Sequence, residues 1–336
     1  SPFRKSIAQR TIESLEQRDL LPLYSNSFYL PLFARLMGHI YGDGWAYRDK
    51  KNNVVIGFSG TIDDLKIIQG DLSLLNIKFS SIYSRKTSST INSIKYNKID
   101  VKGTSNSFMV TDKSLTKILL TLGLPIGNKT NNLFLVPNWI LNGSNRVKKE
   151  FLSSLMGSEG YIPRLKKNKK TCLPVRLSFN IITKLRKRSL QYAQQLKSLF
   201  MEFKIGVSIS ERSGNIRKDG SKTVKVVLTI SNSNGDMARF LQNINYTYAQ
   251  EKRKQGKWIL QYLLSKEKNL HNRIETYKEA RNLHKSGLGS YKISNILGLD
   301  RGTIENWIYY HKKPSLITAS MQGIKEKNID DNYSIV

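Results

Sequence analysis

A nine-residue stretch, LMGHIYGDG at residues 36–44, has a second version in the same chain, LSSLMGSEG at residues 152–160. Each version is a largely apolar segment that closes with a carboxylate, Asp43 or Glu159, followed by glycine. Because glycine stops helices, each acid is expected at the C-terminal end of a helix. The chain is therefore predicted to contain two similar helices that each end in one acid.

Small residues recur four positions apart in both versions, as Gly38 and Gly42 in the first and Ser154 and Ser158 in the second. Residues four apart share one face of a helix, so two such helices can pack with their backbones close together. Packing would bring both acids together at the electronegative helix ends. Two acids placed there need a cation, and a divalent metal with oxygen ligands suits them. The pattern predicts a metal site.

Charge is the strongest signal in the composition. The 336-residue chain holds 55 Lys and Arg against 25 Asp and Glu, a formal net charge of +30, and the basic residues are spread along its length. Such an excess repels itself in a folded protein unless a polyanion compensates, so nucleic acid is the expected partner. A membrane surface is disfavoured because no strongly amphipathic basic helix is found.

The composition also excludes several classes of protein. Hydrophobic residues make up 39% of the chain, which is typical of a globular protein, and the apolar runs are too interrupted to span a bilayer. A single cysteine, Cys172, excludes an internal disulfide framework and a multi-cysteine zinc site. The first residues lack an apolar signal core. We expect an intracellular, cytoplasmic protein of two or three domains.

The segments after the two versions follow the same order. After the first come strands around 45–58, a helix at 63–75, strands at 77–85 and 95–102, and a helix at 113–122. After the second come strands at 161–165 and 173–180, a helix at 185–203, strands at 207–212 and 225–230, and a helix at 235–242. These patterns predict a duplicated α+β unit.

The chain is accordingly divided into an N-terminal extension (1–28), two repeats (29–144 and 145–268), a helical domain (269–315) and a tail (316–336). The helical domain is expected to hold a helix at 273–285, a short helix capped by Ser290, and a further helix at 301–310. Two short helices joined by a tight turn are typical of a DNA-binding helix-turn-helix, whose second helix enters the major groove. A generic three-helix module is the alternative.

Both versions of the motif resemble the signature of the LAGLIDADG homing endonucleases, and the intervening pattern resembles that family's αββαββα unit. The resemblance covers roughly residues 29–265, and the helical domain looks like those carried by some family members. It implies two αββαββα units that form a saddle over DNA, with the motif helices at their interface. It also implies a monomeric, site-specific double-strand DNA endonuclease with a long asymmetric target.

The resemblance further implies the metal ligands. Asp43 and Glu159, with Gly42 and Ser158 immediately before them, would bind Mg²⁺, for which Mn²⁺ or Ca²⁺ can stand in. Each acid would serve mainly one DNA strand. The glutamate in the second motif departs from the family's aspartate and lengthens the ligand by one methylene.

Other residues are assigned to the neighbourhood of this centre. The family places a basic residue near it in each half, and Lys129 and Lys252 match that pattern. Such lysines would orient water or stabilise charge at phosphorus as catalytic residues. Ser59 and Asn180 are the expected polar neighbours. His39 is expected to be a partly buried helix residue rather than a catalytic base.

Basic and polar residues on the predicted strands are the expected DNA contacts, because side chains alternate between the two faces of a strand. The candidates are Arg85, Lys86, Lys95 and Lys98 in the first repeat, and Arg164, Arg176, Arg212, Arg217, Lys222 and Lys225 in the second. In the helical domain, Arg301, Thr303, Glu305 and Asn306 are expected to face outward. Loops at 84–93 and 213–221 are expected to follow the DNA backbone.

Two other functions are compatible with this pattern. A non-cleaving transcription regulator would share the fold and the helix-turn-helix, but it has no need of Asp43 and Glu159. An RNA-binding intron maturase would share the basic surface, although a major-groove helix favours duplex DNA. Protein splicing is not expected, because the sequence does not end in His-Asn and the internal His271-Asn272 pair precedes Arg273, which cannot act as a splicing nucleophile.

Overall fold

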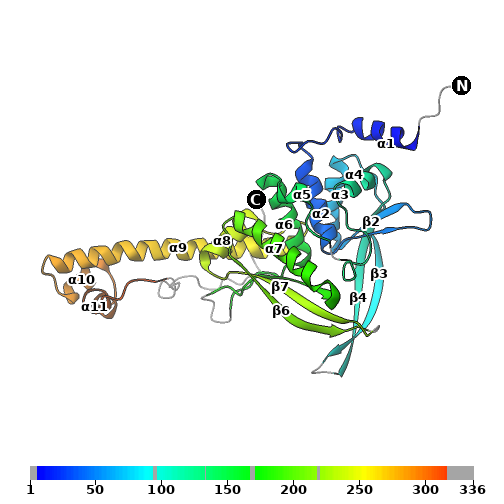
Figure 1. The fold of residues 1–336 in the computed structure, drawn as a ribbon. Coiled ribbons are helices and arrows are strands. Elements are labelled where there is room, and N and C mark those ends of the chain that lie inside the picture. Colours follow the sequence, from blue (N-terminus) through cyan, green and yellow to red (C-terminus); the bar gives the residue numbers. More distant parts are fainter. Residues whose placement is uncertain (1–5, 94–96, 133, 167–170, 218–219, 316–336) are drawn as a thin grey trace. The chain divides into compact units, whose positions relative to one another are not determined.

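The computed structural model describes residues 6–93, 97–132, 134–166, 171–217 and 220–315 (Figure 1). The chain divides into two compact units. Unit 1 comprises Ser1–Arg164 with Cys172–Lys257, and unit 2 comprises Leu165–Thr171 with Trp258–Val336. Within the described residues, no helix is both long enough and apolar enough to cross a membrane.

The first half of unit 1 follows the predicted order of elements. A short helix, α1 (Ile7–Glu16), precedes the motif helix α2 (Leu30–Tyr41). There follow β1 (Trp45–Arg48), β2 (Val54–Gly60), α3 (Ile62–Leu74), β3 (Tyr83–Ser93), β4 (Asn97–Val110) and α4 (Lys113–Thr121). The strands form an antiparallel sheet in the order β1-β2-β4-β3.

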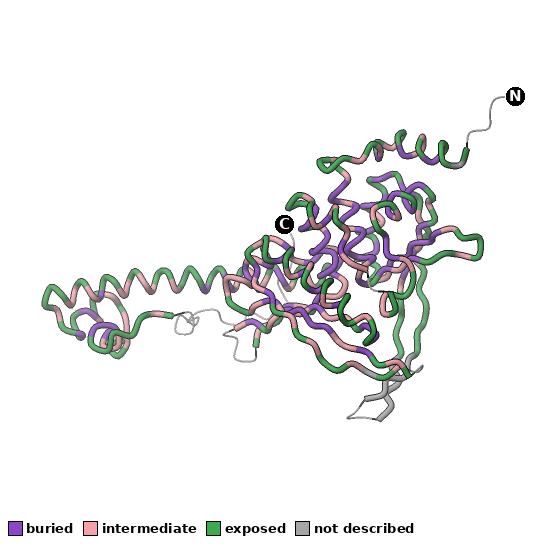
Figure 2. Tube along the Cα trace, viewed as in Figure 1, coloured by how far each residue is buried: buried purple, intermediate pink, exposed green. Residues whose placement is uncertain are grey.

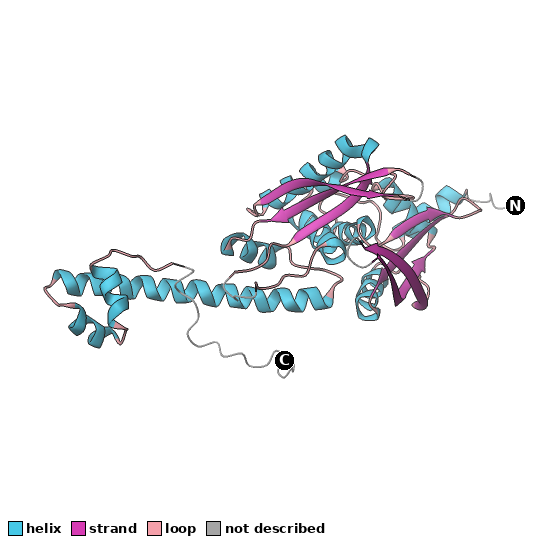
Figure 3. Cartoon of the chain, turned by 90° about the horizontal axis from the view of Figure 1, so that it is seen from below, coloured by secondary structure: helices cyan, strands magenta, loops and turns pink. Residues whose placement is uncertain are grey.

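The second half repeats this order with one strand fewer among the described residues. It contains α5 (Asn138–Leu141), the motif helix α6 (Asn145–Glu159), β5 (Arg176–Ile182), the 3₁₀ turn η1 (Thr183–Leu185), α7 (Arg186–Glu202), β6 (Val207–Ile216), β7 (Lys222–Ile230) and α8 (Asn234–Asn243). Its antiparallel sheet has the order β5-β7-β6, and Figure 3 shows the two sheets as separate groups of strands. The chain is therefore of mixed α+β class.

One predicted strand is absent from the described part of the second half. Residues 161–165 do not form a strand, and a single bridge from Gly160 to Leu177 is what remains of the pairing with β5. Tyr161 adds one hydrogen bond, from its N–H to the Arg176 carbonyl (2.8 Å). Pro163 interrupts the segment and has no N–H to donate to a ladder, which gives the physical reason for the missing strand.

Two segments predicted as loops are strands. β3 covers all of 84–93 and pairs with β4 in continuous register from Tyr83–Ser107 to Ser93–Asn97. β6 likewise continues to Ile216, with a register shift after Ser213. Residues 84–93 are rich in Ser and Thr, and threonine favours strands as readily as serine favours turns. Residues 213–215 are Ser-Gly-Asn, which is typical of a turn, yet β6 continues through them. Figure 1 shows β3 and β4 extending past the helices of their half.

The two motif helices pack directly against each other, and both are largely buried (Figure 2). A Cβ added to Gly38 would lie 2.4 Å from the Phe151 carbonyl oxygen, and one added to Gly42 would lie 2.1 Å from Ser158 Oγ. Contacts this close require glycine at both positions. The spacing of small residues in the sequence thus predicted the face through which α2 and α6 meet.

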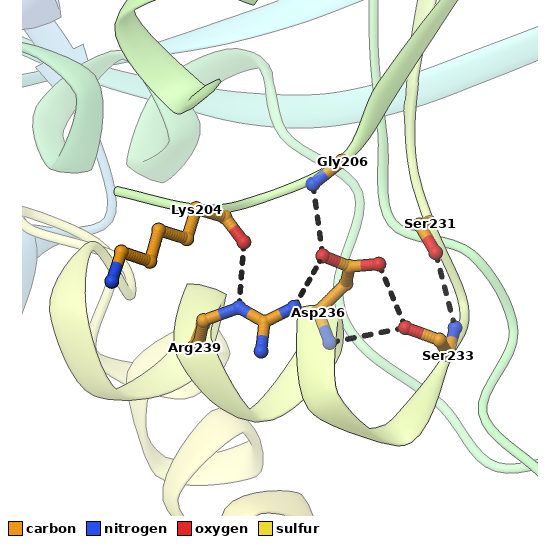
Figure 4. Close-up of polar contacts among 6 residues, drawn as sticks. All are labelled: Lys204, Gly206, Ser231, Ser233, Asp236 and Arg239. Carbon is orange, nitrogen blue, oxygen red and sulfur yellow. Dashed lines mark hydrogen bonds and ion pairs between the residues drawn. The ribbon is translucent and has the colours of Figure 1, made fainter. Parts of the chain in front are cut away.

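Helix α8 shows how local polar groups set an element in place (Figure 4). Ser233 caps the helix by accepting the N–H of Asp236 at its Oγ (3.1 Å). The Asp236 carboxylate accepts hydrogen bonds from Gly206 N–H (2.9 Å) and Arg239 Nη2 (2.8 Å), and Arg239 Nε donates to the Lys204 carbonyl (2.6 Å). These bonds tie the helix to the start of β6.

Unit 2 contains most of a long helix, α9 (Gln250–Lys285), followed by α10 (Ser290–Leu297) and α11 (Arg301–Ile308). A left-handed Gly298 (φ +61°) ends α10, and Asp300 caps α11. Ile293, Ile304 and Trp307 form the centre of a small core with α9. The helix expected at 273–285 is longer than predicted, since α9 begins 23 residues earlier, at Gln250.

The expected cap at Ser290 is also wrong. Gly289 occupies the N-cap position of α10, and Ser290 is the first residue of the helix. Its Oγ donates to Glu305 Oε1 (3.2 Å) instead, which connects α10 to α11.

Candidate functional site

The two acids lie side by side because α2 and α6 meet at their C-terminal ends. Glu159 is the last residue of α6, and Asp43 follows the C-cap residue of α2, Gly42. The Cβ position of Gly42 is 3.2 Å from Glu159 Cγ. The predicted convergence of the two carboxylates is thus a feature of the structure.

Neither carboxylate has a hydrogen-bond donor within the described residues. Partial burial raises the pKa of Asp43, while the ammonium groups of Lys252 and Lys129 act in the opposite direction. Burial and the neighbouring Asp43 raise the pKa of Glu159, and the same two lysines oppose this rise. Two acids held in this way repel each other and attract a further cation.

The two lysines bind the ends of the motif helices rather than the acids themselves. Lys129 Nζ donates to the carbonyls of Ile40 (3.2 Å), Gly44 (2.9 Å) and, more closely, Gly42. Lys252 Nζ donates to the carbonyls of Gly157 (2.7 Å) and Ser158 (3.0 Å). Each lysine therefore satisfies unpaired carbonyls at the C-terminus of the helix in its own half.

Burial also acts on the lysines. It lowers the pKa of both ammonium groups, and the two carboxylates counteract this effect. The result is a compact group of two acids and two bases, each with a pKa displaced from its ordinary value. Such groups are common in functional sites.

Lys252 is brought to the site by a chain segment anchored on both sides. Lys252 lies in the first turn of α9. Before it, Tyr248 adopts a left-handed conformation (φ +59°) and its hydroxyl donates to Asp71. Gln250 N–H donates to Asp64 Oδ1 (2.8 Å). These contacts with α3 connect the second lysine to the first half of the unit.

The donor set suits a small, hard divalent cation. The described residues contain no group of three or more His, Cys, Asp and Glu side chains able to hold a metal. Two carboxylates and nearby backbone carbonyls remain, and Mg²⁺ is commonly bound by one or two carboxylates with water and substrate phosphate. The carbonyls of Gly42 and Ser158, implied as ligands by the resemblance, already accept lysine hydrogen bonds.

Polar neighbours surround the acids. Ser59 Oγ donates to the Asp43 carbonyl (2.8 Å). On the other side, a cavity of about 270 Å³ is lined by Glu159, Lys129, Ser178 and Asn180 among others. Ser178 was missed by sequence analysis, although its position two residues before Asn180 on one strand puts both on the same face.

His39 is buried, as expected, with 3% of its surface exposed. Its ring lies against Phe58 and Tyr248 (centroids 5.7 and 5.8 Å), and within the described residues neither ring nitrogen has a hydrogen-bond partner. Burial and the Lys129 charge lower the pKa of His39 to about 4. The imidazole is thus neutral at physiological pH and closed off from substrate.

In the second sheet, the strand register places two of the predicted DNA contacts, Lys225 and Arg212, in line with Asn180, the expected polar neighbour of the acids. Asn180 lies opposite Lys225, which lies opposite Arg212, so the three form one row across β5, β7 and β6. Arg176 shares their face of β5, since it lies four residues before Asn180. Its Nε is buried without a hydrogen-bond partner among the described residues.

In the first sheet, the register separates two predicted contacts. Ser59, Ser107 and Tyr83 lie opposite one another, so Arg85 shares their face and Lys86 points to the other. Both side chains are exposed. Lys98 belongs to β4, but its side chain is outside the described residues, as is all of Lys95.

The remaining predicted contacts lie elsewhere. Arg164 is exposed before the second sheet, and Arg217 donates to Asn131 Oδ1 (2.6 Å). In unit 2, Arg301 is exposed but donates to Glu305 (2.8 Å), and Asn306 donates to the Gly302 carbonyl (2.8 Å). Thr303 is half-buried.

Comparison with protein families supports the resemblance over part of the chain. Residues 146–245 match the model of a LAGLIDADG-like domain. The match extends from α6 to just beyond α8 and includes Glu159, whereas Asp43, Lys129 and Lys252 lie outside it. It supports a nuclease or DNA-binding fold for the second half of unit 1.

Curated proteins similar to the chain carry unrelated names. In Methanocaldococcus jannaschii, DNA-directed RNA polymerase subunit Rpo1N is 34% identical over 79% of this chain and 19% of its own length. The tRNA-splicing ligase RtcB of that organism is 28% identical over 98% of the chain and 34% of its own. Replication factor C small subunit of the same organism is 30% identical over 70% of this chain and 12% of its own length. The chain thus spans about a third or less of these relatives.

Proposed function

We propose that the protein is a site-specific double-strand DNA endonuclease of the LAGLIDADG homing type, dependent on a divalent metal. The observation that carries the proposal is the pair of acids, Asp43 and Glu159, held together at two packed helix ends without hydrogen-bond donors among the described residues. A regulator that only binds DNA gains nothing from keeping two acids in that position.

The reaction proposed is hydrolysis of one phosphodiester in each strand. A water oxygen bonds to phosphorus, the bond from phosphorus to the 3′ oxygen breaks, and the products are a 3′ hydroxyl and a 5′ phosphate. A bound Mg²⁺ would supply an activated water and charge neutralisation at the phosphate. Asp43 and Glu159 would hold it, with Gly42 and Ser158 beside them.

The lysines have a defined place in this proposal. Lys129 and Lys252 keep the ends of α2 and α6 in position through their carbonyl hydrogen bonds. Their positive charge also favours the ionised form of both acids and the approach of a phosphate. Their role in catalysis is thus both positional and electrostatic.

We further propose that the two α+β halves are duplicated units whose sheets lie against DNA as a saddle. The row of Asn180, Lys225 and Arg212 supplies polar and basic groups on one face, and Arg176 and Arg85 extend the contacts. Lys86 lies on the opposite face of the first sheet from Arg85. The halves differ in sequence and, among the described residues, in strand number, which fits a monomer and an asymmetric target. The repeat boundaries proposed are 29–144 and 145–268.

Unit 2 is proposed as an additional DNA-binding module of the helix-turn-helix type, at 269–315. Its support is the sharp turn at Gly298 and Asp300 between α10 and α11, with Trp307 in the core. Arg301, Thr303 and Asn306 on α11 are the proposed contacts. Both Arg301 and Asn306 make a hydrogen bond within α11, from Arg301 to Glu305 and from Asn306 Nδ2 to the Gly302 carbonyl. Asn306→Ala is the substitution that tests base preference, because it removes an amide and changes no charge.

The relatives add a separate argument. A polymerase subunit, an RNA ligase and a replication factor share no activity in their names, yet each contains a segment similar to this chain. A function belonging to the segment itself explains that distribution more simply than any of the three named activities. A mobile module that cuts DNA is such a function.

Cleavage of a plasmid library of random target sites, with Mg²⁺ or with a chelator, tests the proposal. We expect sequence-selective double-strand breaks that need the metal. Binding of a DNA site without any cleavage would favour the regulator, and selective binding of structured RNA without DNA cleavage would favour the maturase.

A further inference from the structure

A second, basic hollow lies in unit 1 beside the candidate active site. Its volume is about 530 Å³, and its lining includes Asn132, Lys184, Arg217 and Lys222. Asn132 also lines the cavity that holds Glu159 and Lys129. The two spaces are therefore neighbours, and a nucleic acid strand that passes Glu159 can reach the hollow.

The hollow is held in shape by contacts between segments far apart in the sequence. Arg217 Nη1 donates to Asn131 Oδ1 (2.6 Å), and Ile182 N–H donates to the Thr130 carbonyl (3.4 Å). Thr183 Oγ1 donates to the Lys222 carbonyl (2.9 Å). These bonds join the segment after Lys129 to the end of the second sheet, so the hollow is built by the fold.

Among the described residues, the lining of the hollow carries only positive charge. Three cationic side chains line it, and none of the described residues that form its wall is an Asp or Glu. The ammonium groups of Lys184 and Lys222 have no hydrogen-bond or ion-pair partner in the part of the chain that the structure describes. Like charges gathered without a counter-ion repel one another, and an anion bound between them removes that cost.

The geometry points to a subsite for a backbone phosphate of the DNA strand that is cut on the Glu159 side. This inference rests on the proposed function and deepens it. Lys184 and Lys222 neutralise the phosphate, while the Asn and Thr groups of the wall offer hydrogen bonds. Contacts of this kind fix the register of the strand but do not read its bases.

The test measures binding to a labelled duplex of random sequence over a series of salt concentrations. The affinity of a DNA-binding protein falls as salt rises, so the slope of log K against log salt is negative. For the double variant Lys184→Gln with Lys222→Gln, this slope should be less steep by about 2, roughly 0.9 for each lysine that no longer neutralises phosphate charge. The matched control removes two exposed lysines outside the hollow, by Lys66→Gln with Lys78→Gln, and should keep the wild-type slope.

Two results would overturn the inference. One is a slope for Lys184→Gln with Lys222→Gln equal to that of the wild type or of the control pair. The other is a rise in Tm with inorganic phosphate that needs these lysines while the slope does not change, which would identify a site for the free ion. If the wild type cleaves the plasmid library but the double lysine variant keeps the wild-type salt slope, the subsite alone is overturned. If the double variant has the less steep salt slope but the wild type cleaves no plasmid, the nuclease proposal is overturned and the phosphate subsite is kept.

Discussion

At the scale of single residues, the acids of the candidate centre lower the stability of the protein that carries them. The folded-state pKa of Glu159 is raised, so the folded chain binds that proton more tightly than the unfolded chain. The ionised carboxylate therefore reduces stability at any pH above its folded pKa. Sites arranged for function often have this property.

Glu159→Gln should accordingly raise the Tm in metal-free buffer at neutral pH. The gain should shrink as the pH falls through the folded pKa, because the wild-type acid is then neutral as well. Added Mg²⁺ should raise the Tm of the wild type and have a smaller effect on the variant. Thermal unfolding over a range of pH, with and without the metal, checks these three outcomes.

Glu211→Gln is the matched control, because the pKa of Glu211 is shifted in the opposite direction to that of Glu159. The hydrogen-bonded Arg186 lowers the pKa of Glu211, so its neutralisation should not raise the Tm. If Glu159→Gln lowered the Tm in metal-free buffer, the view of Glu159 as a strained acid would be wrong.

At the scale of elements, the contact between α2 and α6 depends on glycine. Gly38→Ala places a Cβ 2.4 Å from a backbone carbonyl, which cannot move aside as a side chain can. We expect a loss of about 1–3 kcal/mol in the free energy of unfolding. Urea denaturation measures it.

Gly70→Ala provides the comparison within another helix. Gly70 lies inside α3 with no atom within 4 Å of its Cβ position. Alanine should therefore stabilise the protein by about 0.5–1 kcal/mol. Equal effects of the two substitutions would show that the close approach of α2 and α6 is not what requires Gly38.

The start of α8 should contribute stability that depends on pH. Burial opposes ionisation of Asp236, but hydrogen bonds from Gly206, Ser231, Ser233 and Arg239 bring its pKa below the ordinary value of 3.8. A depressed folded-state pKa gives stability that is complete above the unfolded value and is lost as the pH falls through the folded one. Asp236→Asn should cost about 2 kcal/mol at neutral pH.

The advantage of the wild type over Asp236→Asn should fall away in acid, as followed by urea denaturation at several pH values. Glu267→Gln, an exposed position on α9, should change stability by less than about 0.5 kcal/mol throughout. A cost for Asp236→Asn that did not vary with pH would contradict the role given to the carboxylate.

At the scale of the whole molecule, the features that depend on local residue patterns are the ones that can be predicted from the sequence. The two motif helices, their acids and the face through which they pack follow from residue spacing. The full lengths of β3 and β6 did not follow, because the Ser- and Thr-rich run at 84–93 and the Ser-Gly-Asn run at 213–215 suit turns and exposed ribbons equally well.

Non-local contacts set the limit of prediction. The start of α9 at Gln250 was missed because its charged sequence has weak apolar periodicity. The basic hollow was missed for a different reason. It depends on contacts between distant segments, such as that between Arg217 and Asn131, which cannot be read from spacing along one segment. Ser178, by contrast, follows from the alternation of side chains along β5, since it lies two residues before Asn180.

The pairing of Asp43 with Glu159 as one metal-dependent centre is tested most directly by cleavage of a plasmid that carries the selected site. In Mg²⁺, the wild type and Glu267→Gln should convert supercoiled plasmid to the linear form. Asp43→Asn and Glu159→Gln should each reduce double-strand cleavage by at least about 100-fold, since each removes one group that organises charge at a scissile phosphate. Linearisation at the wild-type rate by either variant would contradict the account.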